Sequence, residues 1–368
     1  MDGRIRIAEK ENDIESRAVK AYQNGKKLYI YGCGEIGRIL ETRLRSSGCR
    51  IEAFTADRNY FVQGQLVQDI PVICTSDVLV QKEDAAVIIG HRRQKPCMDW
   101  GGAGMEVIDG DIFSMHSCDS SGQLDYEFVM QHLDRFQQTC DLLEDDKSRR
   151  CLEAYLNQKI SGKFEYLKDC YEDNQYFDKE LVDFSRIRTL ADCGAYDGDS
   201  YHSFRKNFKE NTGREYEGRA YLLETDPDNY KKLKKNCENW KNSYALNTGA
   251  WDKRAVLKFA GRGTSGGISS NGSIFVNVDS LDSLVEGELD FIKMDIEGSE
   301  YRALSGAGRQ IKTYHPILAV CVYHKKWDLI EIPQLILSFC PEYKFYLRAY
   351  SRYCQELVLY GIYGGRRK

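Results

Sequence analysis

Hydrophobic and polar positions divide the chain into stretches with different patterns. Between residues 26 and 112, short β-rich runs alternate with amphipathic helical patterns, which is typical of a parallel α/β sheet. The expected strands here are Leu28–Tyr31, Ile51–Thr55, Ala86–Gly90 and Glu106–Ile108. From about residue 124 to residue 184 the β pattern is lost, and two proline-free segments predict helices, Tyr126–Leu143 and Lys147–Gln158.

The β/α alternation resumes at Thr189 and continues to the last part of the chain. Its expected strands include Ser243–Asn247, Phe291–Met294 and Pro316–Val322. Two closing runs, Tyr343–Tyr350 and Glu356–Tyr363, predict a β-hairpin. We therefore expect a Rossmann-like nucleotide-binding-type domain over residues 1–115, a helical connector over residues 116–186, and a second α/β domain over residues 187–368.

Composition narrows the class of protein. The 368 residues are 42% hydrophobic and 29% charged, as in a soluble globular protein, and the net charge of −4 argues against a nucleic-acid partner. The charged start of the chain does not resemble a secretion signal, and apolar runs such as Ile317–Tyr323 are too short to span a membrane. The 13 cysteines include no C-x-x-C pair, so we expect reduced thiols, no zinc site and a cytoplasmic location.

The first α/β stretch carries a glycine motif directly after its first strand. Gly32, Gly34 and Gly37 follow the order G-x-G-x-x-G, and Asp57 lies after the second strand, where an acid would bind a ribose. This spacing suits a pyrophosphate at a helix N-terminus. The same spacing also suits a turn that serves only for packing. Both interpretations, a bound nucleotide and a structural turn, therefore stay open.

The second α/β stretch begins with different turn chemistry. Asp192 precedes Gly194 and Gly198 in a D-x-G-A-x-x-G pattern. An aspartate would repel a pyrophosphate but suits the ammonium group of S-adenosylmethionine, which has no phosphate. The alternative is a simple capped loop, with Asp197 or Asp199 as the helix N-cap. At the tip of the next strand, a carboxylate at Glu224 could accept hydrogen bonds from both ribose hydroxyls.

Further candidates follow the later strands of this domain. Ala250 and Trp251 come where an adenine pocket would be completed. Asp295, Glu297 and Glu300 follow the strand Phe291–Met294, and three carboxylates so close together favour a functional cleft over an inert core. Helix N-terminal charge is the alternative explanation for the two glutamates. The next strand ends at a histidine, His324, whereas Lys293 lies inside its strand and is interpreted as structural.

Several segments together resemble the FkbM family of methyltransferases. They are D-C-G-A-Y-D-G, L-L-E-T-D-P, F-I-K-M-D-I-E-G-S-E, H-P-I-L-A-V-C-V-Y-H and the closing hairpin, spread over Thr189–Tyr363. The resemblance implies a class I methyltransferase fold, with a seven-stranded, mostly parallel sheet whose last strand is antiparallel. It also implies S-adenosylmethionine as the methyl donor and a hydroxyl acceptor on a sugar or secondary metabolite.

Carried over by position, the resemblance implies which residues hold the cofactor: Asp192, Gly194, Ala195, Tyr196, Asp197, Gly198, Glu224, Thr225, Ala250, Trp251 and Asp295. Glu224 is followed by Thr225, whereas a proline or an alanine is more usual after this glutamate in the family, and this departure would shift the turn. The segment Asn174–Asp178 resembles an extension of bacterial members that packs on the methyltransferase. The glycine motif near the start resembles the small domain of sugar-modifying acyltransferases that holds a nucleotide-sugar.

We therefore predict an O-methyltransferase that acts on a hydroxyl of a sugar, nucleotide-sugar or secondary metabolite. Asp295, Glu297 or His324 would be the general base, and a divalent metal at this cluster is a less favoured alternative. An N/D-P-P-Y/F turn is absent after the fourth strand, which favours oxygen over nitrogen as the acceptor. The alternatives are an NAD(P)- or nucleotide-sugar-dependent enzyme using Gly32–Gly37, and a non-catalytic cofactor sensor. A homo-oligomer is left open.

Overall fold

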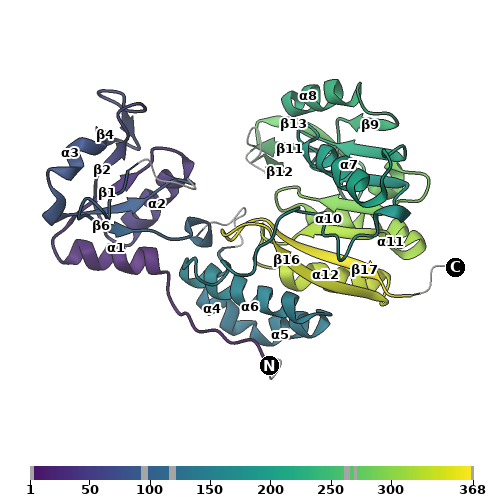
Figure 1. The fold of residues 1–368 in the computed structure, drawn as a ribbon, viewed down its shortest axis with the longest axis horizontal. Helices are drawn as coiled ribbons and strands as arrows, with labels where there is room; N and C mark the ends of the chain where they lie inside the picture. Colours follow the sequence, from purple (N-terminus) through teal and green to yellow (C-terminus); the bar gives the residue numbers. More distant parts are fainter. Residues whose placement is uncertain (1–3, 93–97, 116–121, 261–265, 269–271, 366–368) are drawn as a thin grey trace.

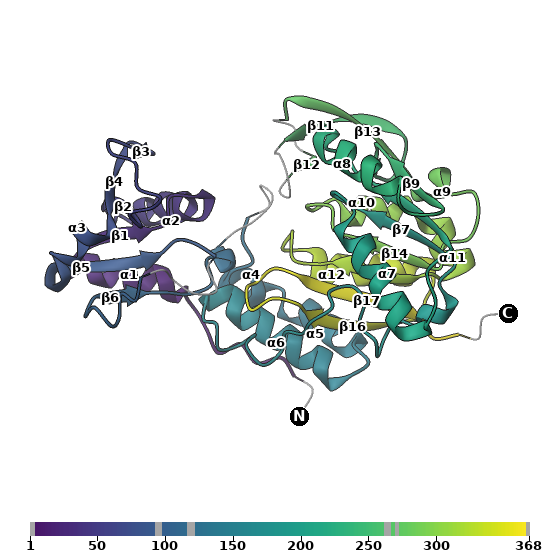
Figure 2. The same cartoon turned by 45° about the horizontal axis from the view of Figure 1, so that its top comes forward.

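The computed structural model describes residues 4–92, 98–115, 122–260, 266–268 and 272–365. An N-terminal unit lies at one end and a larger C-terminal unit at the other, with the helices α4–α6 below them (Figure 1 and Figure 2). Both units combine helices with sheets, so the α/β fold class is confirmed. Within the described ranges, no helix is long and apolar enough to cross a membrane.

The N-terminal unit contains a six-stranded sheet in the order β3-β4-β2-β1-β5-β6. Its strands are β1 (Lys27–Tyr31), β2 (Ile51–Ala56), β3 (Leu66–Val67), β4 (Ile70–Cys74), β5 (Ala85–Ile89) and β6 (Glu106–Ile108), and its helical elements are α1 (Asp13–Gln23), α2 (Glu35–Ser46), α3 (Thr75–Leu79), η1 (Lys82–Asp84) and η2 (Ile112–Met115). Strands β3 and β4 were not predicted. Both strands consist of apolar residues, but β3 has only two residues, β4 contains a proline, and only Val67 and Val72 are buried.

The helical segment consists of α4 (Tyr126–Gln131), α5 (Leu133–Leu142) and α6 (Asp146–Ser161). The prediction of one helix over Tyr126–Leu143 was wrong, because the backbone at His132 leaves the helical region at φ −117° and ψ 19°. The His132 ring lies 4.8 Å from the ring of Trp327, which is far away in the sequence. A tertiary contact thus accompanies the break, and the local pattern could not show it.

The C-terminal unit contains a seven-stranded sheet in the order β16-β17-β15-β14-β7-β8-β9. Its strands are β7 (Thr189–Cys193), β8 (Arg219–Leu223), β9 (Ser243–Leu246), β14 (Phe291–Met294), β15 (Ile317–Cys321), β16 (Tyr343–Ala349) and β17 (Leu357–Tyr363). Neighbouring strands are parallel except at β17, which runs antiparallel to both β15 and β16.

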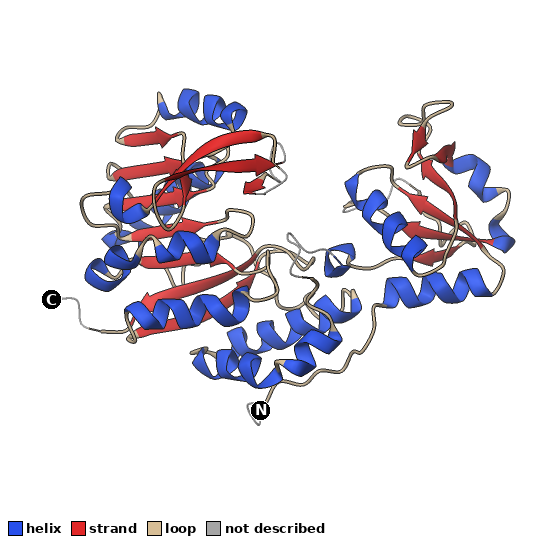
Figure 3. Cartoon of the chain, turned by 180° about the vertical axis from the view of Figure 1, so that it is seen from behind, coloured by secondary structure: helices blue, strands red, loops and turns tan. Residues whose placement is uncertain are grey.

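Helices flank this sheet on both faces (Figure 3). They are η3 (Phe184–Arg186), α7 (Asp199–Thr212), α8 (Pro227–Cys237), α9 (Leu281–Leu284), α10 (Glu300–Ser305), α11 (Gly308–Tyr314) and α12 (Asp328–Phe339). Residues of β15 alternate between two cores, because Leu318 and Val320 face one hydrophobic cluster and Ala319 and Cys321 face the other. Asp226 is the N-cap of α8, and Pro227 is the first residue of the helix.

A second, smaller sheet in the C-terminal unit was not predicted. It has the order β10-β13-β11-β12. Its strands are β10 (Gly249–Ala250), β11 (Ala255–Ala260), β12 (Gly267–Ile268) and β13 (Ile274–Asp279). Val256 and Phe275 are 61% and 69% exposed, so apolar residues on these strands do not mark a buried face.

Candidate functional site

One cavity of about 1350 Å³ lies between the carboxyl ends of the seven-stranded sheet and the glycine turn of the N-terminal unit. Eight predicted residues of the C-terminal unit line it: Gly194, Tyr196, Glu224, Thr225, Ala250, Asp295, Glu297 and His324. From the N-terminal unit, Gly32, Gly34 and Asp57 line the same cavity. Parallel α/β sheets bind ligands beyond the carboxyl ends of their strands, so this is the expected place for a site.

The turn after β7 comes very close to the turn after β14. Gly194 has a φ of 80°, and a Cβ built on it would lie 2.0 Å from the carbonyl oxygen of Asp295, so only glycine fits. Tyr196 and Glu297, which are not glycines, have left-handed φ values of 50° and 53° in these same turns. Such backbone strain is concentrated at ligand sites. The two turns therefore form one tightly built wall of the cavity.

Asp192 is buried and does not line the cavity. Its Oδ1 atom lies 3.0 Å from the Nζ atom of Lys293, and Ser200 donates a hydrogen bond to its other oxygen. Lys293 also donates to the carbonyl oxygen of Gly194 at 2.8 Å, and its side chain lines the cavity. Burial would lower the pKa of Lys293, but Asp192 and Asp295 raise it above its usual value. Lys293 is thus the member of this ion pair that lines the cavity, and direct cofactor binding by Asp192 stays a prediction.

Glu224 lies at the end of β8 with its carboxylate held by the backbone. Oε2 accepts the N–H of Tyr196 at 2.9 Å, and Oε1 accepts the N–H of Asp226 at 2.7 Å. Each oxygen keeps a further lone pair for a ligand hydroxyl, since a carboxylate oxygen can accept two hydrogen bonds. Burial raises the pKa of Glu224 to about 7. The prediction of a bidentate acceptor facing the cavity is compatible with this geometry.

An acidic cluster surrounds His324 at the ends of β14 and β15. The Nδ1 atom of His324 lies 2.9 Å from Glu300, and its Nε2 atom lies 3.5 Å from Asp295 and 3.7 Å from Glu297. The His324 side chain is 1% exposed and that of Glu300 is fully buried, whereas Glu297 is 28% exposed. Glu300 also accepts the N–H of Ile296. The His324 ring therefore lies between Glu300 and the two other acids, and it lines the cavity with little of its surface exposed.

The environment separates the pKa values of these groups. Burial would lower the pKa of His324, but Glu300, Asp295 and Glu297 raise it well above its usual value. Burial raises the pKa of Glu297 to about 7. Burial would also raise that of Asp295, but Lys293, His324 and Tyr176 lower it. Of the three candidate bases, Glu297 is the one with a pKa near neutrality and an accessible carboxylate.

Tyr176 is a site residue that sequence reasoning did not single out. Its hydroxyl donates to Asp295 at 2.7 Å, and Tyr323 donates to the other oxygen of Asp295 at 3.3 Å. The segment from residue 174 to residue 177 lines the cavity. Only its likeness to an extension of bacterial family members pointed to this segment, and nothing local marks Tyr176 as a hydrogen-bond donor to a distant acid.

The remaining predicted residues lie away from the cavity wall. Trp251 packs against the small sheet near Phe259, and Gly37 lies behind the first glycine turn. Ala195 is fully buried, Asp197 accepts a hydrogen bond from Asn236 at its carbonyl oxygen, and a Cβ on Gly198 would meet the ring of Trp240. The alternative of an aspartate N-cap on α7 was wrong, because Gly198 is the N-cap and no side chain caps that end.

Asp295, Glu300 and His324 also offer ligand atoms that lie within 4.8 Å of one another. This spacing suits a divalent cation. However, the Glu300 carboxylate already accepts a backbone N–H and lies beside Nδ1 of His324. Among the described residues, however, the other Glu300 oxygen, Oε2, and the Nε2 atom of His324 have no hydrogen-bond partner.

Residues 192–350 match the model of the methyltransferase FkbM domain. The crystal structure of a methyltransferase FkbM from Methylobacillus flagellatus KT superposes with a TM-score of 0.74 at 23% identity, covering 94% of this chain and 93% of that one. A putative rRNA methylase from Clostridium thermocellum aligns with a TM-score of 0.30 at 13% identity, covering 48% of this chain and 88% of that one. No curated protein matches the sequence.

Proposed function

We propose that this chain is an S-adenosylmethionine-dependent O-methyltransferase acting on a hydroxyl of a sugar, nucleotide-sugar or other small molecule, because residues 192–350 match the model of the methyltransferase FkbM domain. In this proposal the seven-stranded sheet is the class I methyltransferase sheet. The observation that carries it is the position of Glu224 and Glu297, two carboxylates with raised pKa values, at strand ends that face one cavity.

The donor set of the cavity fits a cofactor with a ribose and an amino-acid tail. Glu224 has one spare lone pair on each oxygen for two adjacent hydroxyls. The ammonium group of Lys293 faces the cavity beside Gly194, where it can pair with a carboxylate. The backbone of Gly194 and Tyr196 forms the wall between these two groups. When bound, S-adenosylmethionine supplies an electrophilic methyl group.

Glu297 is the residue we assign as the general base. A hydroxyl acceptor must lose its proton as it is methylated, and a base is most effective when its pKa lies near the working pH. Glu297 meets this requirement with a pKa of about 7, and its carboxylate is accessible from the cavity. The proton would move from the acceptor hydroxyl to a carboxylate oxygen of Glu297.

Asp295 and His324 are assigned to positioning. Two tyrosine hydroxyls and the nearby cations stabilise the Asp295 carboxylate, which makes it a weak base. The three surrounding carboxylates raise the pKa of His324 well above its usual value and so favour the imidazolium form, which has no lone pair to accept a proton. The Nε2 atom of His324 lies near Asp295 and Glu297, which line the cavity, and its Nδ1 atom contacts Glu300.

Calorimetry with S-adenosylhomocysteine and a turnover assay with a panel of hydroxyl compounds test this assignment together. Glu224→Gln should lower the affinity for S-adenosylhomocysteine by roughly 10- to 100-fold, because it weakens charge-assisted hydrogen bonds. Glu297→Gln should leave that affinity unchanged and lower kcat by roughly 10²- to 10⁴-fold. The exposed Glu286→Gln is the matched control and should change neither. Unchanged affinity in Glu224→Gln would mean that the cofactor lies elsewhere.

A further inference from the structure

The glycine turn of the N-terminal unit faces the same cavity as the proposed methyl-transfer site. Gly32, Gly34 and Asp57 line it on one side, and Glu297 and His324 line it on the other. We propose that this turn binds the diphosphate of a nucleoside-diphosphate-linked methyl acceptor and presents the attached hydroxyl to Glu297. This inference rests on the proposed function, because it assigns the substrate class of that site.

The three glycines of the turn have different structural roles. A Cβ on Gly32 would lie 2.6 Å from the carbonyl oxygen of Gly90, and one on Gly37 would lie 2.1 Å from that of Gly32. Packing of the protein itself therefore explains these two glycines. A Cβ on Gly34 would meet nothing within 4 Å, and Gly34 lines the cavity. Its bare backbone leaves open space where a ligand can approach.

Gly34 is also the N-cap of α2, a helix of 12 residues. No side chain makes a capping hydrogen bond at this end, so the first backbone N–H groups of α2 have no side-chain acceptor. Free N–H groups and the positive end of the helix dipole are the usual partners of a phosphate. Glu35 in the first turn lowers this potential, and Arg92, which also lines the cavity, adds positive charge.

A second, independent observation comes from Thr55 at the end of β2. Its side chain is fully buried and lines the cavity, and its hydroxyl has no hydrogen-bond partner among the described residues. An unpaired buried hydroxyl costs free energy unless a ligand satisfies it. Its carbonyl oxygen accepts the N–H of Gly32, which places Thr55 beside the glycine turn. The unpaired Thr55 hydroxyl, next to the glycine turn, therefore points to a polar ligand at this turn.

Asp57 and the size of the cavity indicate a nucleotide rather than a free phosphate. Asp57 follows β2 and accepts the hydroxyl of Tyr31 at 2.7 Å on Oδ2, which orients its carboxylate at the cavity wall. An acid at this position suits a ribose hydroxyl. The volume of about 1350 Å³ exceeds the roughly 300–1000 Å³ of single-ligand pockets, so it has room for two ligands.

The test is calorimetry on the full chain saturated with S-adenosylhomocysteine, titrated in separate arms with UDP, ADP, NAD⁺ and inorganic pyrophosphate. We expect at least one nucleoside diphosphate to bind more tightly than both pyrophosphate and NAD⁺. Gly34→Asp should weaken that binding by at least about tenfold, because it adds a negative charge beside the phosphates. The same change should leave the Tm unchanged or raise it, since aspartate is a favoured N-cap residue.

Two further variants separate local from general effects. Thr55→Val should weaken nucleoside diphosphate binding roughly 3- to 10-fold through the loss of one hydrogen bond. Ser76→Asp adds the same charge at the exposed N-terminus of α3, outside the cavity lining, and should change nothing. An equal loss in Ser76→Asp, tighter binding of NAD⁺, or no binding of any nucleoside diphosphate would overturn the inference. If no nucleoside diphosphate binds but S-adenosylhomocysteine does, only this inference fails and the proposed function stands. If S-adenosylhomocysteine does not bind either, the proposed function itself is refuted.

Discussion

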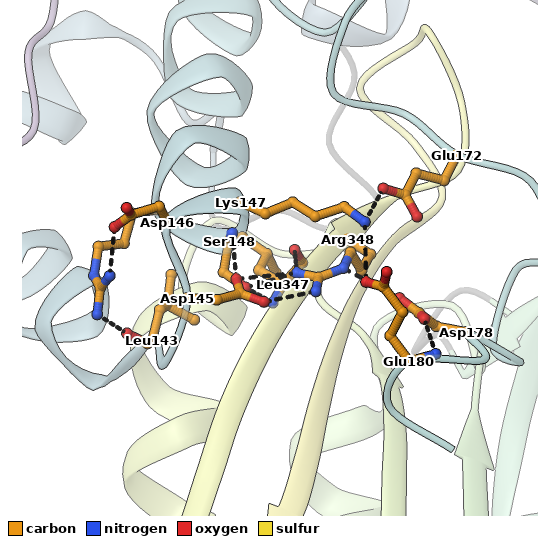
Figure 4. Close-up of polar contacts among 11 residues, drawn as sticks. Leu143, Asp145, Asp146, Lys147, Ser148, Glu172, Asp178, Glu180, Leu347 and Arg348 are labelled. Carbon is orange, nitrogen blue, oxygen red and sulfur yellow. Dashed lines mark hydrogen bonds and ion pairs between the residues drawn. The ribbon is translucent and has the colours of Figure 1, made fainter. Parts of the chain in front are cut away.

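Arg348 on β16 offers a sharp test of how the helical segment supports the site. Its guanidinium group is buried and contacts two acids, Asp145 at the start of α6 and Asp178 (Figure 4). Nη2 lies 2.7 Å from Asp145, Nε lies 3.2 Å from Asp178, and Nη1 donates to the hydroxyl of Ser148 at 2.8 Å. The side chain of Asp178 is 5% exposed, so Arg348 neutralises a buried carboxylate.

Arg348→Met keeps the apolar stem and removes the charge. Breaking a buried ion pair from one side costs about 3–5 kcal/mol, because the remaining charge stays buried without a partner. For a unit of this size the loss corresponds to a fall in Tm of roughly 6–20 °C. Differential scanning calorimetry measures it. Arg149→Met on α6 is the matched control: Arg149 donates to the carbonyl oxygen of Leu143, and its acidic partner Asp146 is 77% exposed, a kind of ion pair that contributes only about 0–1 kcal/mol.

A double variant identifies the cause of the loss. Replacing both members of the buried Arg348–Asp178 pair, in Arg348→Met with Asp178→Leu, removes the buried unpaired carboxylate and leaves only the partly exposed Asp145, so it should recover most of the lost stability. Asp178 follows Tyr176, which donates to Asp295, so the single variant should also lower kcat. If Tm falls no further in Arg348→Met than in Arg149→Met, the interpretation that Arg348 forms a buried ion pair that stabilises the fold is refuted.

The remaining predictions concern the cavity. The affinity for S-adenosylhomocysteine should rise with pH through about 7, because the ribose hydroxyls bind the ionised form of Glu224. Calorimetry at several pH values on wild type and Glu224→Gln measures this dependence. An equal rise in affinity in both proteins would contradict the role of Glu224. The rate should rise in the same range, because Glu297 must be deprotonated to act as a base, and a pH–rate profile without an inflection near 7 would exclude that role. Lys293→Met should destabilise the chain by about 3–5 kcal/mol in urea unfolding, because the buried Asp192 loses its partner; a loss below about 1 kcal/mol would contradict a buried pair. Chelation with EDTA should leave turnover unchanged, and a loss that Mg²⁺ or Mn²⁺ restores would assign the cluster at His324 to a metal.

The sequence alone determined the features that depend on local pattern. Strands with a continuous apolar run, such as Ile317–Cys321 within the predicted Pro316–Val322, were predicted because burial acts over a few residues. The acids at 224 and 297 could also be placed at strand ends, since parallel strands present their carboxyl ends at one edge of a sheet.

The tertiary structure decided which of these groups act together. The register of β7 against β14 places Lys293 beside Asp192, and this pairing is not visible from the spacing of the two residues along the chain. The contact between Tyr176 and Asp295 joins residues 119 positions apart, and the shared cavity joins the two units. These relations depend on packing between distant segments, and the pKa values that separate Glu297 from Asp295 and His324 depend on it as well. Spacing along one chain carries no information on such distances.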